Sequence, residues 1–195
     1  GAGRSTRFLK SLGFNATGVD ISQSMLVNAR RQDAEGNYFQ VGEGDLSALK
    51  GNTFNLILSA FPLCSITTQE SMVTVLSGLK SLLATTGRLI SVEATEVLYT
   101  REWVSFSMAP FPQNARAKSG DPVSACFRNR MDMPVTDTFW TDEDYSQCQG
   151  QAGLARLETL RPLADGNDPG PWISEQHYPP WVIYVLANAQ ETGGH

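Results

Sequence analysis

Predicted helices and strands alternate through residues 1–94, and this alternation narrows the range of folds more than any other feature of the chain. The expected order is helix 5–12, strand 16–20, a helix beginning after Ser22, strand 38–41, strand 55–60, helix 68–84 and strand 88–93. Strand 55–60 is strongly apolar, which is typical of a strand buried on both faces. Alternation of this kind favours a parallel sheet joined by crossover helices.

Two of these helices carry local signals. In helix 68–84, Thr67 and Glu70 have the spacing of a capping box. The helix after Ser22 is expected to use that serine as its N-cap and to turn Met25, Leu26 and Ala29 inward.

The second half of the chain has a different pattern. Residues 94–107 are predicted to be helical, 109–122 to form a loop, 123–133 to form a strand, and a helix is predicted from Thr141 to Ala152. Candidate strands at 157–160 and 181–186 have no helical pattern between them. These two strands are therefore expected to form an antiparallel pair at one edge of the sheet.

Composition limits the classes of function. At 195 residues the chain is predicted to be one domain, and its net charge of −5 argues against binding to nucleic acid. No apolar run approaches the length of a membrane span. Cys64, Cys126 and Cys148 form neither a disulfide framework nor a metal-binding pattern, so we expect buried thiols, a cytoplasmic location and no metal.

A glycine-rich turn, Gly1–Thr6, precedes an acidic residue, Asp20, at the end of the next predicted strand. Glycines allow a ligand to approach the backbone, and a carboxylate at that place can bind ribose hydroxyls. The pair indicates a nucleoside-cofactor site. A nicotinamide-binding domain is one alternative, but its fingerprint needs a third glycine where this chain has Thr6.

Several motifs in order resemble the class I S-adenosylmethionine-dependent methyltransferases that act on small molecules. Gly1–Thr6 is similar to the later part of their first motif, and 18–22 to their second. Gly44-Asp45-Leu46 is similar to the loop that contacts adenine, 54–61 to the fourth strand, and 82–89 to the turn before the fifth strand. The first central strand of the family would precede Gly1, so we expect a longer native chain, a partner segment or second copy that supplies the strand, or a sheet closed in another way.

The resemblance implies a Rossmann-like α/β fold: a three-layer sandwich with a mostly parallel sheet and an antiparallel C-terminal edge. It also implies a cofactor-binding half, 1–94, and a substrate-side half, 95–195. The residues that it places at S-adenosylmethionine are Gly1, Gly3, Asp20, Ile21, Met25, Gly44, Asp45, Leu46, Ser59, Ala60 and Phe61.

In the roles that the resemblance implies, Gly1 and Gly3 allow the methionine part of the cofactor to lie against backbone. Asp20 accepts from the ribose hydroxyls, and Asp45 accepts from the adenine amine. Simpler interpretations exist: Asp20 caps the helix that begins at Ser22, and Asp45 is a turn residue. Phe61, which the resemblance places near the substrate, is alternatively a core residue.

The resemblance predicts methyl transfer from S-adenosylmethionine to a small-molecule acceptor, with S-adenosylhomocysteine as product. The alternative is a truncated or degenerate, non-catalytic domain that serves binding or interaction. His177 is a weak candidate for a catalytic base, and a surface role is the simpler interpretation. Aromatic and sulfur-containing residues in the second half are candidate walls of an acceptor pocket: Trp103, Phe106, Met108, Phe111, Trp140 and Trp172.

Overall fold

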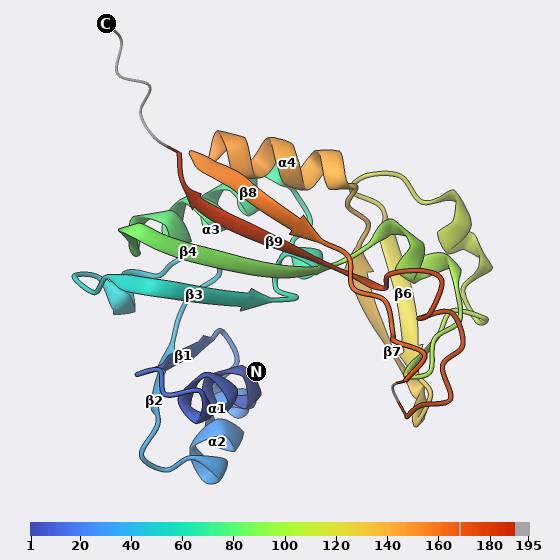
Figure 1. Cartoon of the computed structure of the whole chain (residues 1–195), viewed down its shortest axis with the longest axis horizontal. Coiled ribbons are helices and arrows are strands. Elements are labelled where there is room, and N and C mark those ends of the chain that lie inside the picture. Colours follow the sequence, from blue (N-terminus) through green and yellow to red (C-terminus); the bar gives the residue numbers. More distant parts are fainter. Residues whose placement is uncertain (168, 190–195) are drawn as a thin grey trace, which may run out of the picture. The chain divides into compact units, whose positions relative to one another are not determined.

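The computed structural model describes residues 1–167 and 169–189, so the C-terminal His195 lies outside the described residues. The chain divides into two compact units, Gly1–Thr53 and Phe54–His195 (Figure 1). We refer to them as unit 1 and unit 2 and describe each by itself.

Unit 1 contains two short parallel strands and the helices connected to them. Its elements are α1 (Arg4–Ser11), β1 (Thr17–Asp20), α2 (Gln23–Gln32), β2 (Asn37–Gln40) and the 3-10 turn η1 (Ser47–Leu49). The strands pair in parallel, as the alternating pattern predicted, with Asp20 opposite Gln40 at the carboxyl ends. A small buried core joins α2 to β2 through Leu26, Ala29 and Tyr38.

The cap of α2 confirms one prediction, whereas the burial of the helix corrects another. The Ser22 side chain accepts a hydrogen bond from the Met25 backbone N–H, as expected of an N-cap. Leu26 and Ala29 are buried, but Met25 is 43% exposed. The inward prediction for Met25 is wrong, because the buried cluster that joins α2 to β2 contains only Leu26, Ala29 and Tyr38.

Unit 2 holds the remaining elements. They are β3 (Phe54–Ala60), η2 (Leu63–Ser65), α3 (Gln69–Ser81), β4 (Leu83–Ala94), η3 (Glu96–Thr100), β5 (Phe106–Ser107), η4 (Pro112–Arg116), β6 (Pro122–Phe127), β7 (Arg130–Thr138), α4 (Asp142–Gln151), β8 (Leu154–Leu160) and β9 (Trp181–Asn188).

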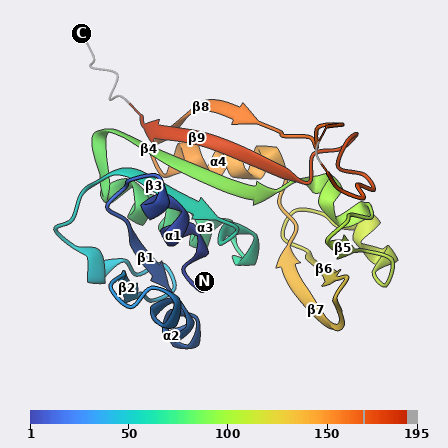
Figure 2. The ribbon, with the colours of Figure 1, turned by 60° about the horizontal axis from the view of Figure 1, so that its bottom comes forward.

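A mixed sheet dominates unit 2, with the strand order β3-β4-β9-β8 (Figures 1 and 2). β3 and β4 are parallel, whereas β4–β9 and β9–β8 are antiparallel. The antiparallel C-terminal edge is therefore confirmed. A mostly parallel sheet is not, because β9 runs antiparallel to both of its neighbours and β5-β6-β7 form a separate antiparallel sheet.

Helices α3 and α4 cover one face of the mixed sheet (Figure 1). Alternate residues of β9 point to that face, so Val182, Tyr184 and Leu186 are buried while the residues between them are half-buried. Sheet and helices make two layers within unit 2, and a third layer stays a prediction.

Several local predictions need correction. The N-cap of α3 is Thr68, whose side chain accepts from the Ser71 backbone N–H, so the capping box expected at Thr67 is wrong. The strand predicted at 123–133 is a hairpin that turns between Phe127 and Arg130. The helix expected at 94–107 is limited to the 3-10 turn η3.

The boundary between the two compact units, at residues 53 and 54, lies inside the expected cofactor-binding half, 1–94. Residue 94 is the end of β4, and β4 pairs with β9 from the second half of the chain. The two expected halves are therefore interleaved within unit 2. That the whole chain acts as one domain stays a prediction.

Candidate functional site

The glycine turn at the start of unit 1 is built around a left-handed backbone. Gly3 precedes α1 with a φ of 75°, a conformation that favours glycine. A Cβ added to Gly3 would lie 2.7 Å from the Tyr38 hydroxyl oxygen and 3.0 Å from the Ala29 Cβ. A Cβ on Gly1 would meet nothing within 4 Å, so space is open on that side of the turn.

Asp20 lies at the carboxyl end of β1, beside this turn. Its Oδ2 contacts the amino group of Gly1, while its Oδ1 accepts a hydrogen bond of 2.7 Å from the Ser22 backbone N–H. Capping of the backbone at Ser22 thus accounts for one of the two carboxylate oxygens of Asp20. The other oxygen contacts the amino group at the start of the glycine turn, and its contact with ribose stays a prediction.

The loop after β2 is a tight turn centred on Gly44, which has a φ of 71°. Asp45 exchanges backbone hydrogen bonds with Gly42, and its Oδ1 accepts from the Ser47 backbone N–H at 2.8 Å. This hydrogen bond lowers the pKa of Asp45 and keeps its carboxylate ionised. Asp45 is therefore a turn residue, and the adenine contact stays a prediction.

Apolar side chains near the end of β1 are open to solvent. Ile21 is 60% exposed, and Leu46, which the resemblance also places at the cofactor, is half-buried. Exposed branched side chains could pack against a flat ring such as adenine, while the carboxylate beside them accepts hydrogen bonds from the attached sugar.

In unit 2, the predicted site residues Ser59, Ala60 and Phe61 lie where β3 ends. Ser59 is buried and its hydroxyl has no hydrogen-bond partner among the described residues. Phe61 is the one non-glycine residue of the described chain with a positive φ, at 65°. Its ring is 39% exposed and lies 4.7 Å, centroid to centroid, from Trp181. Phe61 is thus a strained residue at the rim of the sheet rather than a core residue.

Sequence reasoning missed a buried polar cluster behind this rim. Glu93 is 0% exposed; its Oε1 accepts from the Ser91 hydroxyl at 2.7 Å, and its Oε2 has no partner among the described residues. Burial raises the pKa of Glu93 to about 8. Burial also raises the pKa values of two neighbours, Asp137 and Cys64. The available signal was the pair of polar residues, Ser91 and Glu93, at alternate positions of an apolar strand.

The other candidates from the second half separate into different environments. Trp103 and Met108 are buried in the core beneath β6, and Trp140 is buried with its indole N–H donating to the Ile66 carbonyl. Phe106 packs against Trp181. The half-buried Phe111 and Trp172 have no role assigned by the structure. His177 is exposed in the turn before β9, which fits the surface interpretation.

All three cysteines are free and buried, as expected. Within residues 1–167 and 169–189, no group of three or more histidine, cysteine or acidic residues is placed to hold a metal ion. Within the same ranges, no helix has the length and apolar character needed to cross a membrane.

Comparison with known proteins places this fold. Residues 1–87 match the family described as a methyltransferase domain. An S-adenosylmethionine-dependent methyltransferase from Clostridium acetobutylicum is 14% identical, with a TM-score of 0.65 over 97% of this chain and 81% of that one. The methyltransferase CcbJ from Streptomyces caelestis is 15% identical, with a TM-score of 0.67 over 97% and 80%. The glycopeptide N-methyltransferase MtfA, complexed with S-adenosylmethionine, is 12% identical, with a TM-score of 0.65 over 96% and 78%. No curated protein sequence matches the chain.

The fold is thus that of a Rossmann-like α/β methyltransferase. The match to the methyltransferase-domain family covers residues 1–87 of 195, so in this part the chain is similar to the family that its motifs resemble. S-adenosylmethionine, the cofactor expected from the sequence, is the molecule complexed with MtfA, whose structure is similar to this chain.

Proposed function

We propose that this protein transfers a methyl group from S-adenosylmethionine to a small-molecule acceptor. The observation that carries the proposal is the pairing, within unit 1, of the glycine turn with the carboxylate of Asp20. The match of residues 1–87 to a methyltransferase domain supports it.

The residues of unit 1 fit this cofactor. Gly3 has no room for a side chain, whereas Gly1 borders open space, so the turn offers bare backbone to the methionine part. The Oδ2 of Asp20 would accept from ribose hydroxyls, and hydrogen bonds to a charged acceptor are the stronger kind. Ile21, Met25 and Leu46 would contact the adenine, with Gly44 shaping the loop that carries Asp45.

The aromatic rim of unit 2 supports an acceptor with apolar surface. Phe61 packs against Trp181, which packs against Phe106, and Phe106 lies 4.8 Å from the ring of Phe127. Phe61 and Phe127 both keep exposed ring surface. Such rings would hold an apolar acceptor by area and orient it through their faces.

When bound, S-adenosylmethionine supplies a methyl group that its sulfonium already activates. The chain's own task is then to orient the acceptor lone pair and to exclude water, a task for packed aromatic rings rather than for a strong base. His177, exposed in its turn, would be needed only for an acceptor that must lose a proton.

Two further expectations complete the proposal. In the described residues, β1 pairs with β2 alone and β3 with β4 alone, so each keeps one edge open to a strand from another segment or a second copy. A cytoplasmic location is supported by three cysteines that are free and buried.

The test measures binding of S-adenosylhomocysteine, both by titration calorimetry and by the shift of the thermal midpoint of unfolding. Asp20→Asn keeps an oxygen for the Ser22 N–H and removes the charge, so it should weaken binding by about tenfold or more. Glu35→Ala, an exposed acidic position of the same unit, is the control and should bind normally. A site with a Kd in the micromolar range would be saturated at about 1 mM ligand. If the intact protein then shows neither heat of binding nor a shift of the thermal midpoint, the cofactor proposal is wrong.

A further inference from the structure

The turn after β3 holds Phe61 in a conformation that the surrounding contacts must support. A φ of 65° is left-handed, which costs free energy for a residue with a side chain and persists only where neighbouring groups fix it. The Phe61 N–H donates to the Val92 carbonyl at 2.8 Å, and the Phe61 carbonyl accepts from the Cys64 thiol at 3.0 Å. The thiol of Cys64 is therefore part of what holds the Phe61 turn.

The Cys64 thiol lies among buried acids. Cys64 is 5% exposed, and burial raises the pKa of its thiol, as do the nearby carboxyls of Asp137 and Glu93. The thiol therefore stays protonated and acts as a hydrogen-bond donor. It has one hydrogen, and the geometry directs that hydrogen to the Phe61 carbonyl. A stronger acceptor within the cluster would compete for it.

Glu93 becomes such an acceptor when it is ionised. Its side chain is 0% exposed, its Oε1 accepts from the Ser91 hydroxyl, and its Oε2 has no hydrogen-bond partner among the described residues. Burial raises the pKa of Glu93 to about 8, against smaller opposing effects of the Ser91 hydroxyl and the Cys64 backbone N–H. A buried carboxylate with an open oxygen needs a donor more than a neutral backbone carbonyl does.

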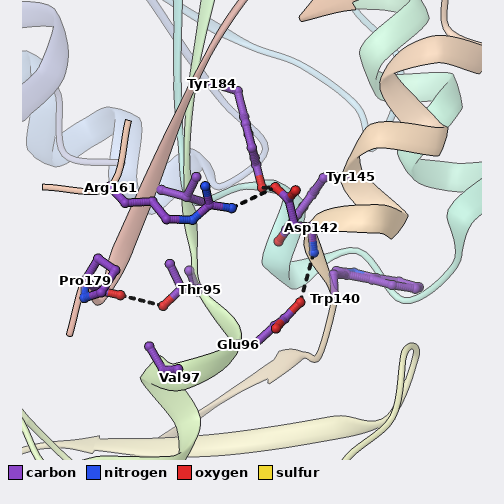
Figure 3. Close-up of a pocket in the computed structure, with 11 residues that line it drawn as sticks. Thr95, Glu96, Val97, Trp140, Asp142, Tyr145, Arg161, Pro179 and Tyr184 are labelled. Atoms are coloured by element: carbon purple, nitrogen blue, oxygen red, sulfur yellow. Dashed lines mark hydrogen bonds and ion pairs between the residues drawn. The ribbon is translucent and has the colours of Figure 1, made fainter. Parts of the chain in front are cut away.

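Titratable groups face Glu93 from the neighbouring elements. They are Cys64 of η2, Tyr99 of η3, Asp137 of β7 and Tyr145 of α4. Tyr145 also forms part of the wall of a cavity of about 250 Å³ at the start of α4 (Figure 3). Burial raises the pKa values of both tyrosines above 10.0 and that of the thiol above 9.0, so these three groups stay neutral up to about pH 9. Glu93 and Asp137 are the members of the cluster that change charge below that pH.

We propose that Glu93 is a positioning residue for the acceptor site, on which it acts through the Cys64 thiol and the Phe61 turn. While Glu93 is neutral, the thiol holds the Phe61 carbonyl, and the Phe61 ring packs 4.7 Å from Trp181. Ionisation of Glu93 draws the hydrogen bond of the thiol to the open Oε2 and releases the turn, so the Phe61 ring leaves Trp181. The use of this rim by an acceptor rests on the proposed function, whereas the coupling of Glu93 to the ring does not.

The experiment follows the indole N–H signal of Trp181 by NMR in the full chain, with Trp181→Phe to assign it. The ring current of Phe61 shifts this signal, and Phe61→Leu gives its position without the ring. Cys64→Ala removes the donor and should move the signal toward the Phe61→Leu position. Cys64→Ser keeps a donor and should leave the signal in place. Cys148→Ala, at a cysteine that is also buried, is the matched control and should not move the signal.

A pH titration of the same signal tests the part played by Glu93. As the pH rises from about 6 to about 9, the Trp181 signal of the unmodified chain should move toward the Phe61→Leu position with a midpoint near the pKa of Glu93, about 8. Glu93→Gln stays neutral and should abolish this movement. If Cys64→Ala does not fold, this titration decides the matter.

The proposal is overturned if folded Cys64→Ala leaves the Trp181 signal in place, or if Cys64→Ser moves it as far as Cys64→Ala does. It is also overturned if the signal does not move with pH, or if Glu93→Gln moves like the unmodified chain. Binding of S-adenosylhomocysteine separates this proposal from the proposed function. A chain that binds it but has an unresponsive Trp181 signal overturns the role of Glu93 alone, and a responsive signal without such binding overturns the cofactor proposal alone.

Discussion

Glu93 should make the protein less stable as the pH rises from 5 to 7. Its carboxyl is fully buried, with one oxygen unpartnered among the described residues, and burial raises its pKa from 4.5 to about 8. Between these two pKa values, the folded state therefore keeps the carboxyl proton of Glu93, whereas the unfolded state has released it. The resulting stability is fully present below pH 4.5 and is lost as the pH rises toward 8.

The size of the effect follows from the pKa difference. Between pH 5 and pH 7 the unfolded carboxyl is ionised and the folded one is mainly protonated, which lowers the free energy of unfolding by on the order of 2–3 kcal/mol. Carboxyls with a lowered pKa, such as Asp142 and Glu175, contribute nothing in this window because they are ionised in both states. Asp137, whose pKa burial also raises, changes stability in the same direction as Glu93.

Denaturant unfolding at a series of pH values tests this argument. Glu93→Gln is neutral and isosteric, so it should remove most of the slope between pH 5 and pH 7 and be more stable than the unmodified chain at pH 7. Glu158→Gln, an exposed position on β8, should keep the slope. Equal slopes for the unmodified chain and Glu93→Gln would refute the reasoning.

Two further substitutions, one in each unit, test which local contacts stabilise the fold. Gly3→Ala should destabilise unit 1 by about 1–3 kcal/mol, because the backbone is left-handed and the new Cβ would lie 2.7 Å from the Tyr38 hydroxyl oxygen. Gly13→Ala, with a φ of 88° and open space, should cost about 1 kcal/mol in the same thermal melt, and an equal loss for both would contradict the clash. Asp144→Ala should cost about 2–3 kcal/mol in denaturant unfolding, because the carboxylate accepts from both the Thr141 N–H and hydroxyl. Although burial acts to raise the pKa of Asp144, hydrogen bonds from hydroxyl groups lower it, so this contribution should vanish as the pH falls below about 3.8. An unchanged stability of Asp144→Ala at pH 7 would show that the cap is dispensable.

Much of the local structure could be predicted because it depends on neighbours in the sequence. The Ser22 cap and the helix that begins at Thr141 are set by residues within one turn of each other. The glycine turn and Asp20 are brought together by one helix and one strand, so their proximity also follows from short-range connectivity.

Features that depend on contacts between distant segments could not be predicted from neighbouring residues. The antiparallel pairing of β9 with β8 was predicted, but the antiparallel pairing of β9 with β4, from a distant part of the chain, was not. The buried carboxyl of Glu93 likewise arises where strands and helices far apart in sequence are packed together.

Residue order thus defined the resemblance to methyltransferases and the glycine turn, because backbone conformation and capping act over a few residues. Packing of distant segments defined the mixed sheet and the strained Phe61 rim. The physical reason is that burial, and with it the protonation of Glu93, depends on which surfaces meet rather than on which residues are adjacent.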